Sequence, residues 1–185
     1  MPPSTALVTE EALTVPQPAA VNMDEENFRR FYENTARPLR AYLLRMTNDD
    51  ARTDDILQES YLRLLEAKLP EPMEEAHRKN YLFRIATNLV RTEASRAKPL
   101  PLPDSASAPE SMTERRDIHR LLAQLSQKQR EMLWLAYVEQ FSHREIAEVV
   151  GAKQESIRPM LARARQKLAE LLRQSGFARP AENHP

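Results

Sequence analysis

Residues 141–168, FSHREIAEVVGAKQESIRPMLARARQKL, contain two helical patterns separated by a single glycine. Ser142 and Glu145 form a capping box, in which each side chain accepts a hydrogen bond from the other residue's backbone N–H. Gly151 can adopt the left-handed conformation that ends a helix. Ala147 is small enough for two helices to cross beside it, and the apolar residues around it can fill the angle between them. The stretch therefore predicts a helix-turn-helix, a motif that places its second helix in the DNA major groove.

The second helix of this motif is rich in basic side chains. They are Lys153, Arg158, Arg163, Arg165, Lys167 and Arg173, against the acidic Glu155 and Glu170. Arginine can bind guanine through two hydrogen bonds, and basic side chains also hold DNA phosphates. The alternative is a plain solvated basic face. Because the cap, the turn and the charge all agree, DNA contact is the interpretation that we favour.

Pro159 lies inside this second helix, where a proline removes a backbone hydrogen bond at a cost of about 3 kcal/mol. The N–H groups in the first turn of a helix have no acceptor within the helix, so a proline there loses no bond. We therefore expect either that the helix begins near Ser156, with this serine as its cap, or that it bends at Pro159.

A proline-rich segment divides the chain into two helical parts. Residues 98–113, KPLPLPDSASAPESMT, contain four prolines and predict an extended, flexible linker. Residues 24–97 and 114–175 carry apolar residues at helical spacing, whereas residues 1–23 and 176–185 are interpreted as tails. The expected fold is all-α, with two small helical domains joined by the linker.

Further local signals refine this picture. Pro38 predicts a break or a second helix start within the first apolar run, and KLPEPMEE (68–75) predicts a loop between the later helices. Capping boxes are also expected at Ser111 with Glu114 and at Ser126 with Gln129. Trp134 and Tyr137 are expected in the core. Of Tyr81 and Phe83, which face different sides of one helix, we expect one in the core and one available to stack on DNA bases.

Composition restricts the function further. The chain has 185 residues, 27 basic and 27 acidic side chains, two glycines and no cysteine, which argues against glycine-rich phosphate loops, disulfides and thiolate metal sites. Residues 114–175 contain twelve basic and eight acidic side chains, so the positive charge gathers there. No signal peptide or membrane span is expected. The four histidines, His77, His119, His143 and His184, lack metal-ligand spacing, and no nucleophile supports catalysis by Asp54 and Asp55.

Three segments together resemble the extracytoplasmic-function (ECF) sigma factors of bacterial RNA polymerase, over about residues 24–175. LSQKQREMLWLAYVEQFSHREIAEVVGAKQESIRPMLARARQKLAELL (125–172) resembles the family's fourth domain. DDILQESYLRLL (54–65) resembles the segment that docks on the polymerase clamp, and YLFRIATNLV (81–90) resembles the helix that melts and reads the −10 element. A helix-turn-helix alone would be a weak signal, whereas the three segments in this order are a specific one.

The resemblance implies a protein that binds core RNA polymerase and promoter DNA, works in the cytoplasm, and is not an enzyme. It implies sigma domain 2 over residues 24–97, sigma domain 4 over 114–175, regulation by an anti-sigma protein, and neither a cofactor nor a metal. The implied contacts to the −35 element are Ser142, Lys153, Gln154, Glu155, Arg158, Arg163 and Arg165. Those to the −10 element are Lys68, Arg78, Lys79, Arg84, Asn88 and Arg91. Those to core polymerase are Asp54, Asp55, Gln58, Glu59 and Leu62.

Several positions depart from the family's pattern. Pro159 and Met160 stand where members usually carry serine and arginine, and Thr92 stands where an aspartate is usual. Arg52 and Thr53 replace the first two positions of the acidic clamp motif. We expect Thr53 to cap a helix, with phosphorylation as the less favoured alternative.

These departures leave two other functions open. One is a sigma-like decoy or adaptor that binds an anti-sigma protein or polymerase without reading promoters. The other is a free-standing helix-turn-helix repressor, which would leave the segment 54–65 unexplained.

Overall fold

The computed structural model describes residues 23–70, 72–96 and 120–175, and all regular secondary structure in these ranges is helical. The helices are α1 (Glu25–Thr47), α2 (Asp50–Glu66), α3 (Glu75–Arg96), α5 (Gln127–Tyr137), α6 (His143–Val150) and α7 (Gln154–Gln174). The prediction of an all-α fold is confirmed, as is the loop between α2 and α3. The predicted linker at 98–113, the tail at 176–185, and the capping box of Ser111 with Glu114 lie outside the described residues, as does the tail at 1–23 except for Met23, which packs against the core.

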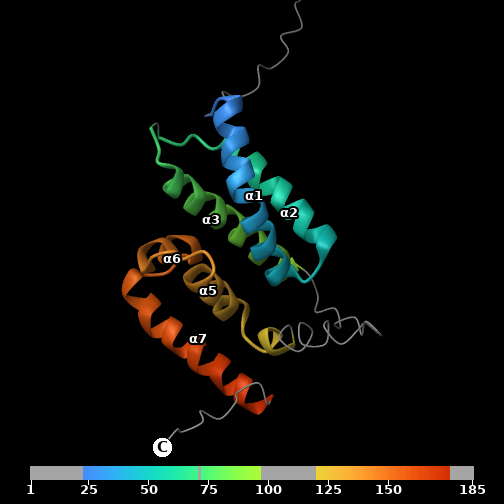
Figure 1. Ribbon diagram of the computed structural model, residues 1–185, viewed down its shortest axis with the longest axis vertical. Helices are drawn as coiled ribbons and strands as arrows, with labels where there is room; N and C mark the ends of the chain where they lie inside the picture. Colours follow the sequence, from blue (N-terminus) through green and yellow to red (C-terminus); the bar gives the residue numbers. More distant parts are fainter. Residues whose placement is uncertain (1–22, 71, 97–119, 176–185) are drawn as a thin grey trace, which may run out of the picture.

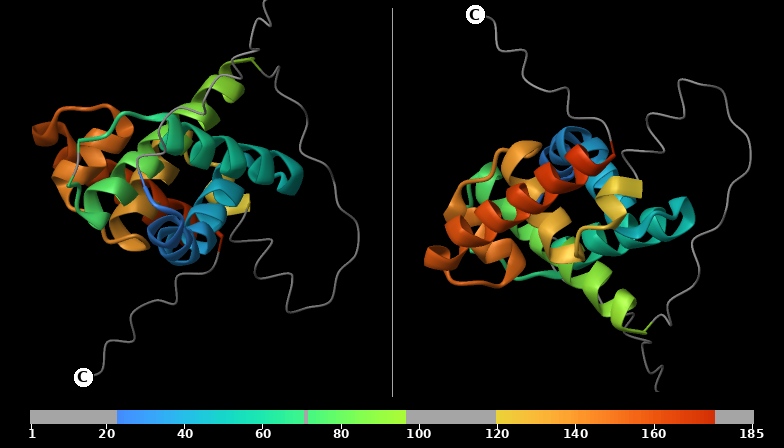
Figure 2. Two further views of the ribbon diagram at one scale, coloured as in Figure 1. Left: turned by 90° about the horizontal axis from the view of Figure 1, so that it is seen from above. Right: turned by 90° about the horizontal axis from the view of Figure 1, so that it is seen from below.

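α3 lies at the centre of the arrangement (Figures 1 and 2). It packs against α1 and α2 on one side and against α6 on the other. α5 and α6 pack against α7, which lies on the side of the C-terminal helices turned away from α3 (Figure 1). The two helical parts of the chain are therefore in direct contact, with α3 between them.

One hydrophobic core runs through both parts. It joins Leu39 and Tyr42 of α1 to Phe83 of α3, and continues to Leu135 of α5 and Ile146 of α6, all fully buried. A second, smaller cluster lies within the C-terminal part. It contains Leu121, Leu125, Leu133, Ala164 and Leu171. Burial of this apolar surface stabilises the contact between the two parts as well as each part by itself.

The aromatic residues were predicted only in part. Phe83 is buried in the core as one of the expected pair, while Tyr81 is partly buried and lies under the guanidinium of Arg84, 4.8 Å from its ring centre. Trp134 packs against the core as predicted. Tyr137 does not, because it lies at the end of α5 with 55% of its surface exposed and its hydroxyl accepts a hydrogen bond from Arg165 (3.1 Å).

Two prolines lie within continuous helices, which corrects both predictions made from them. α1 runs unbroken through Pro38, and α7 begins at Gln154 with Lys153 as its cap, so neither a break at Pro38 nor a start at Ser156 occurs. Each proline removes the N–H that would bind the carbonyl four residues earlier. Those carbonyls belong to Asn34 and Glu155, both exposed, so water can supply the missing hydrogen bond. A bend of α7 at Pro159 stays a prediction.

Replacing Pro159 with alanine should stabilise the protein by about 1–3 kcal/mol. The backbone N–H of alanine can bind the Glu155 carbonyl, and alanine has a higher helix propensity than proline. Urea unfolding of the full chain measures this, with Pro38→Ala as the matched change in α1. Pro38 is partly buried, so its removal also loses packing and should give a smaller gain. An unchanged or lower stability of Pro159→Ala would contradict this account of the freed Glu155 carbonyl.

Candidate nucleic-acid interface

The predicted helix-turn-helix is formed by α6 and α7. The Ser142 hydroxyl accepts from the Glu145 backbone N–H (3.3 Å), and the Glu145 carboxylate accepts from the Ser142 N–H (2.8 Å), which completes the capping box. Gly151 ends α6 in the left-handed conformation, with φ 63° and ψ 48°, and its N–H binds the Ala147 carbonyl. Ala147 and Ile157 are buried in the angle between the helices. The sequence thus fixes both ends of the turn.

α7 presents most of the predicted −35 residues on its surface. Lys153, Gln154, Glu155, Arg158, Arg163 and Arg165 are all exposed. At about 100° per residue, Gln154, Arg158 and Arg165 align along one flank of the helix, whereas Arg163 lies about 140° around it from Arg158. Ser142 lies at the start of α6, where its hydroxyl is engaged in the capping box.

Met160 has a structural role in this helix. Its side chain is partly buried and packs against the core, while Pro159 beside it is exposed. The departure from the family's pattern at Met160 therefore concerns packing, and the departure at Pro159 concerns the exposed surface.

α3 divides the predicted −10 residues between two surroundings. Arg84 and Asn88 are exposed, as is Lys68 in the loop that follows α2, and Arg78 is partly buried. Lys79 and Arg91 instead face the C-terminal helices. Lys79 lies 2.9 Å from the carboxylate of Glu139. The structure therefore leaves only some of the predicted residues free to meet DNA.

Arg91 is held by the C-terminal helices at three points. Its Nε donates to one carboxylate oxygen of Glu131 (3.2 Å), its Nη2 donates to the other, and its Nη1 donates to the Val150 carbonyl (3.0 Å). The Glu131 side chain has no exposed surface. This two-pronged geometry is the strongest arrangement of an arginine and a carboxylate.

The predicted polymerase-binding residues follow the exposed face of α2. Asp54, Asp55, Gln58 and Leu62 are exposed, and Leu62 has 47% of its surface open to solvent. Glu59 is partly buried and pairs with Arg63 at 2.7 Å. The spacing of these residues places polar side chains around one exposed leucine.

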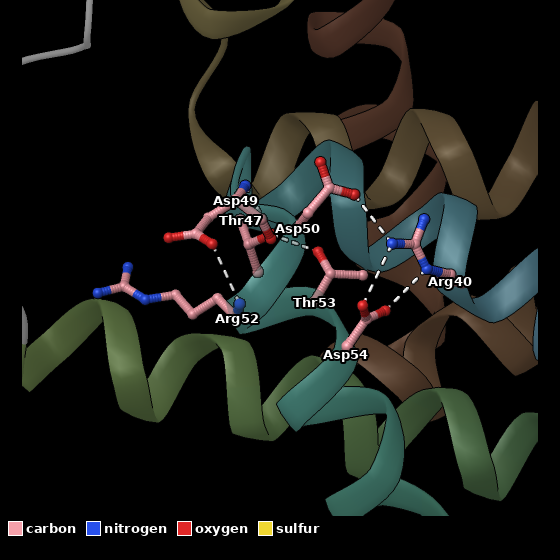
Figure 3. A network of polar contacts seen from close by, with 7 residues as sticks. All are labelled: Arg40, Thr47, Asp49, Asp50, Arg52, Thr53 and Asp54. Atoms are coloured by element: carbon pink, nitrogen blue, oxygen red, sulfur yellow. Dashed lines mark hydrogen bonds and ion pairs between the residues drawn. The ribbon is translucent and has the colours of Figure 1, made fainter.

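Arg40 of α1 neutralises part of this face (Figure 3). Its guanidinium binds Asp54 at 2.8 Å and Asp50 at 2.9 Å. The hydrogen bond that Arg40 donates to Asp54, followed by the one it donates to Asp50, raises the pKa of Arg40 above its usual value. Asp55 has no such partner among the described residues, so its carboxylate is the freer of the two.

Thr53 does not cap α2, which corrects the prediction. Asp49 is the cap, and its carboxylate accepts from the Arg52 N–H (3.1 Å; Figure 3). Thr53 lies one turn further along, where its side chain is fully buried and its hydroxyl shares a hydrogen bond with Thr47 (2.8 Å). A modifying enzyme could reach this hydroxyl only if the start of α2 unfolded, which argues against phosphorylation.

Three acidic residues that meet α3 were not predicted from the sequence. Glu131, Glu139 and Glu148 come from α5, from the turn after it and from α6. A signal for Glu131 was available, since it lies four residues before Leu135 on the apolar face of α5, where an acidic side chain requires a partner. Burial and the nearby charge of Glu131 also raise the pKa of Tyr42 far above its usual value.

Comparisons with known proteins agree with this geometry. The model of sigma-70 region 2 matches residues 31–99, and that of sigma-70 region 4 matches residues 115–168. The ECF RNA polymerase sigma factor EcfG of Rhodopseudomonas palustris is 30% identical over a match covering 72% of this chain and 78% of EcfG. The chain belongs to the ECF sigma factors. The ECF sigma factor SigL of Mycobacterium tuberculosis is 29% identical, with 82% of this chain and 92% of SigL covered.

Solved structures share the fold of this sigma factor. The sigma factor RpoE, crystallised with the anti-sigma factor NepR from Bartonella quintana, has a TM-score of 0.63 and 20% identity, covering 80% of this chain and 98% of RpoE. CnrH, in complex with the cytosolic domain of CnrY, has a TM-score of 0.64 and 20% identity, covering 82% of this chain and 90% of CnrH. Sigma factors regulate transcription and are not enzymes. None of the described helices of this sigma factor could span a membrane.

Replacing Gly151 with alanine should lower the free energy of unfolding by about 1–2 kcal/mol, because a Cβ disfavours the left-handed conformation. The space around Gly151 is open, with no atom within 4 Å of an added Cβ, so the cost comes from the backbone alone. Gly151→Asn is the matched control, since asparagine tolerates this conformation and should cost less. Urea unfolding that ranks alanine equal to or above glycine would contradict this role for the turn.

Proposed function

We propose that this sigma factor docks on core RNA polymerase through the exposed face of α2 and directs it to promoters through α3 and α7. The observation that carries the proposal is the order of its parts: a region 2 match and a region 4 match in one chain, the latter with an exposed recognition helix. In this proposal residues 24–97 form the domain that binds polymerase and the −10 element. Residues 114–175 form the domain that reads the −35 element.

The docking face on α2 depends mainly on three residues. Asp55 and Gln58 offer free acceptors for a basic clamp surface, and Leu62 supplies an apolar anchor. Asp54 and Glu59 contribute less, because Arg40 and Arg63 already engage their carboxylates.

The recognition helix α7 meets the −35 duplex with the flank that carries Gln154, Arg158 and Arg165. Lys153 and Arg163 lie around it and contact phosphates, and Glu155 accepts from the amino group of a cytosine. Ser142 orients the start of α6. Arg84 and Asn88 of α3 meet unpaired −10 bases, supported by Lys68, Arg78, Lys79 and Arg91. The stack of Arg84 on Tyr81 offers a surface on which a base can lie.

An anti-sigma protein is a further expected partner, since the structures of RpoE with NepR and of CnrH with CnrY share this fold. Because core RNA polymerase and the chromosome lie in the cytoplasm, we expect the protein to act there. No cofactor, metal or small-molecule substrate enters this function. A decoy or adaptor remains the second candidate, because Pro159 lies on the exposed surface of the recognition helix.

Transcription by purified core polymerase on a library of random promoters, with and without this protein, tests the function. Discrete start sites that need the protein, with enriched −35 and −10 sequences, are the expected result. Co-elution with core polymerase but no start sites would favour the decoy. Binding to duplex DNA without any binding to polymerase would favour a repressor.

Asp55→Asn should weaken binding to core polymerase more than Asp54→Asn. The two changes remove the same charge one residue apart, but Arg40 already neutralises Asp54. Fluorescence anisotropy of the labelled protein, titrated with core polymerase, measures both affinities. Equal losses, or a larger loss for Asp54→Asn, would contradict the docking face described above.

Arg158→Ala should weaken binding of the holoenzyme to its enriched promoters by about 1–3 kcal/mol and relax the sequence selected in the −35 element. Arg173→Ala is the matched control, because Arg173 is an exposed arginine near the far end of the same helix. Repeating the promoter selection with each variant shows the outcome. An unchanged −35 sequence with Arg158→Ala would exclude this residue from base recognition.

A further inference from the structure

The end of α5 carries an exposed tyrosine that the core does not use. Tyr137 is the last residue of this helix, and 55% of its surface is open to solvent. Neither hydrophobic cluster of the described residues contains its ring, whereas Trp134, one turn earlier, packs against the larger cluster. A side chain this exposed adds little to stability through burial. Its hydroxyl, by contrast, has a specific partner.

The Tyr137 hydroxyl holds Arg165 of α7 in place. Arg165 donates from Nη1 to the phenol oxygen at 3.1 Å, and because α5 packs against α7 this bond joins two helices. Among the described basic residues of α7, only Arg165 has a side-chain partner on another helix, since Lys167 pairs with Glu170 of α7 itself. A guanidinium that is already oriented loses less conformational entropy when it binds a ligand.

Tyr137 positions Arg165 without neutralising its charge. Arg40 and Arg91 are engaged by carboxylates of the same chain. Within the part of the chain that the structure describes, Arg165 has no ion pair with a carboxylate, and its only side-chain partner is the neutral phenol. The full positive charge and the remaining N–H donors of the guanidinium are therefore available to an anion.

The tyrosine also keeps a donor of its own. A phenol has one O–H donor besides its acceptor lone pairs, and here the oxygen accepts from Arg165. A hydrogen bond received from a cation polarises the O–H group and strengthens it as a donor. Two donors, one neutral and one charged, thus lie 3.1 Å apart on an exposed surface. This arrangement suits the oxygens of a single phosphate group.

The place of the pair on α7 fits the edge of the major groove. Arg165 lies seven residues after Arg158, which is about 20° around the helix and about 10 Å along it. A recognition helix brings its N-terminal residues to the base edges. Because the major groove is only about 8.5 Å deep, a residue about 10 Å further along the helix reaches the sugar–phosphate backbone. Tyr137, which comes from α5, lies beside Arg165 at this level.

We propose that Tyr137 and Arg165 together form a binding site for one backbone phosphate of the −35 duplex. The site adds a residue of α5 to the surface assigned to α7. It fixes the register of the recognition helix on the DNA and carries no sequence information, as is general for phosphate contacts. This inference rests on the proposed function, because it takes α7 as the helix that meets the −35 duplex.

Binding of the full chain to a fluorescein-labelled DNA duplex of random sequence, followed by anisotropy over a series of KCl concentrations, tests the site. Tyr137→Phe removes only the hydroxyl and should weaken binding about fivefold. The salt dependence should stay unchanged, because a neutral group releases no counterion. Arg165→Met should weaken binding by about tenfold or more and lower the slope of log affinity against log salt by about 0.9.

Tyr32→Phe is the matched control, since it removes the same atom from another exposed tyrosine, on α1. It should leave the affinity unchanged. When Tyr137→Phe is added to Arg165→Met, the further loss should be less than about twofold, because the two side chains act as one site. An affinity of Tyr137→Phe equal to that of Tyr32→Phe, or losses that add fully in the double variant, would overturn the proposal.

Promoter selection with the holoenzyme gives an independent readout. Tyr137→Phe should return the same −35 sequence as the wild type, whereas a changed −35 sequence would assign the hydroxyl to base reading and overturn the proposal. If the wild type gives no polymerase-dependent start sites but Tyr137→Phe still weakens duplex binding, the proposed function fails and the phosphate site stands. If the wild type transcribes from discrete start sites but does not bind the random duplex, the phosphate site fails and the proposed function stands.

Discussion

The double-sided packing of α3 is the constraint on which the rest of the structure depends. α1 and α2 cover one side, and the Phe83–Phe141 contact with the Arg91–Glu131 pair covers the other. Without α3 the core would lose its central aromatic residue and the two domains would lose their register. The same helix also carries most of the residues assigned to the −10 element, so folding and function compete for one surface.

Local signals allowed much of the fold to be predicted from the sequence. The capping boxes at Ser126 and Ser142 and the left-handed Gly151 are formed as expected, because each depends only on residues three or four positions apart. The predictions made from the two prolines were wrong because they considered local propensity without tertiary packing. The low helix propensity of proline costs free energy at Pro38 and Pro159, but the tertiary packing of the apolar faces of α1 and α7 outweighs that cost. The prediction that Thr53 caps α2 was wrong because Asp49, earlier in the chain, is the cap.

The candidate surfaces could be predicted only as sets of residues. The family resemblance pointed to Asp55, Gln58 and Leu62, which are exposed on α2, and to Arg158, which is exposed on α7. It could not show that Arg40, fourteen residues before Asp54, neutralises that carboxylate, or that Glu131 meets Arg91 forty residues away. Such partners are set by how helices pack, and a single sequence carries little information about long-range pairs of charges.

The most direct test of this account is the distance between labels at Glu66 and Gln166 of the otherwise unchanged chain when core RNA polymerase is added. In the proposed function the two domains, which are in contact in this structure, act at separate promoter elements, so we expect them to move apart on the polymerase. We predict a short distance in the free protein and a longer one in the complex. A short distance that persists in a complex competent for transcription would contradict the claim that the two domains act at separate promoter elements.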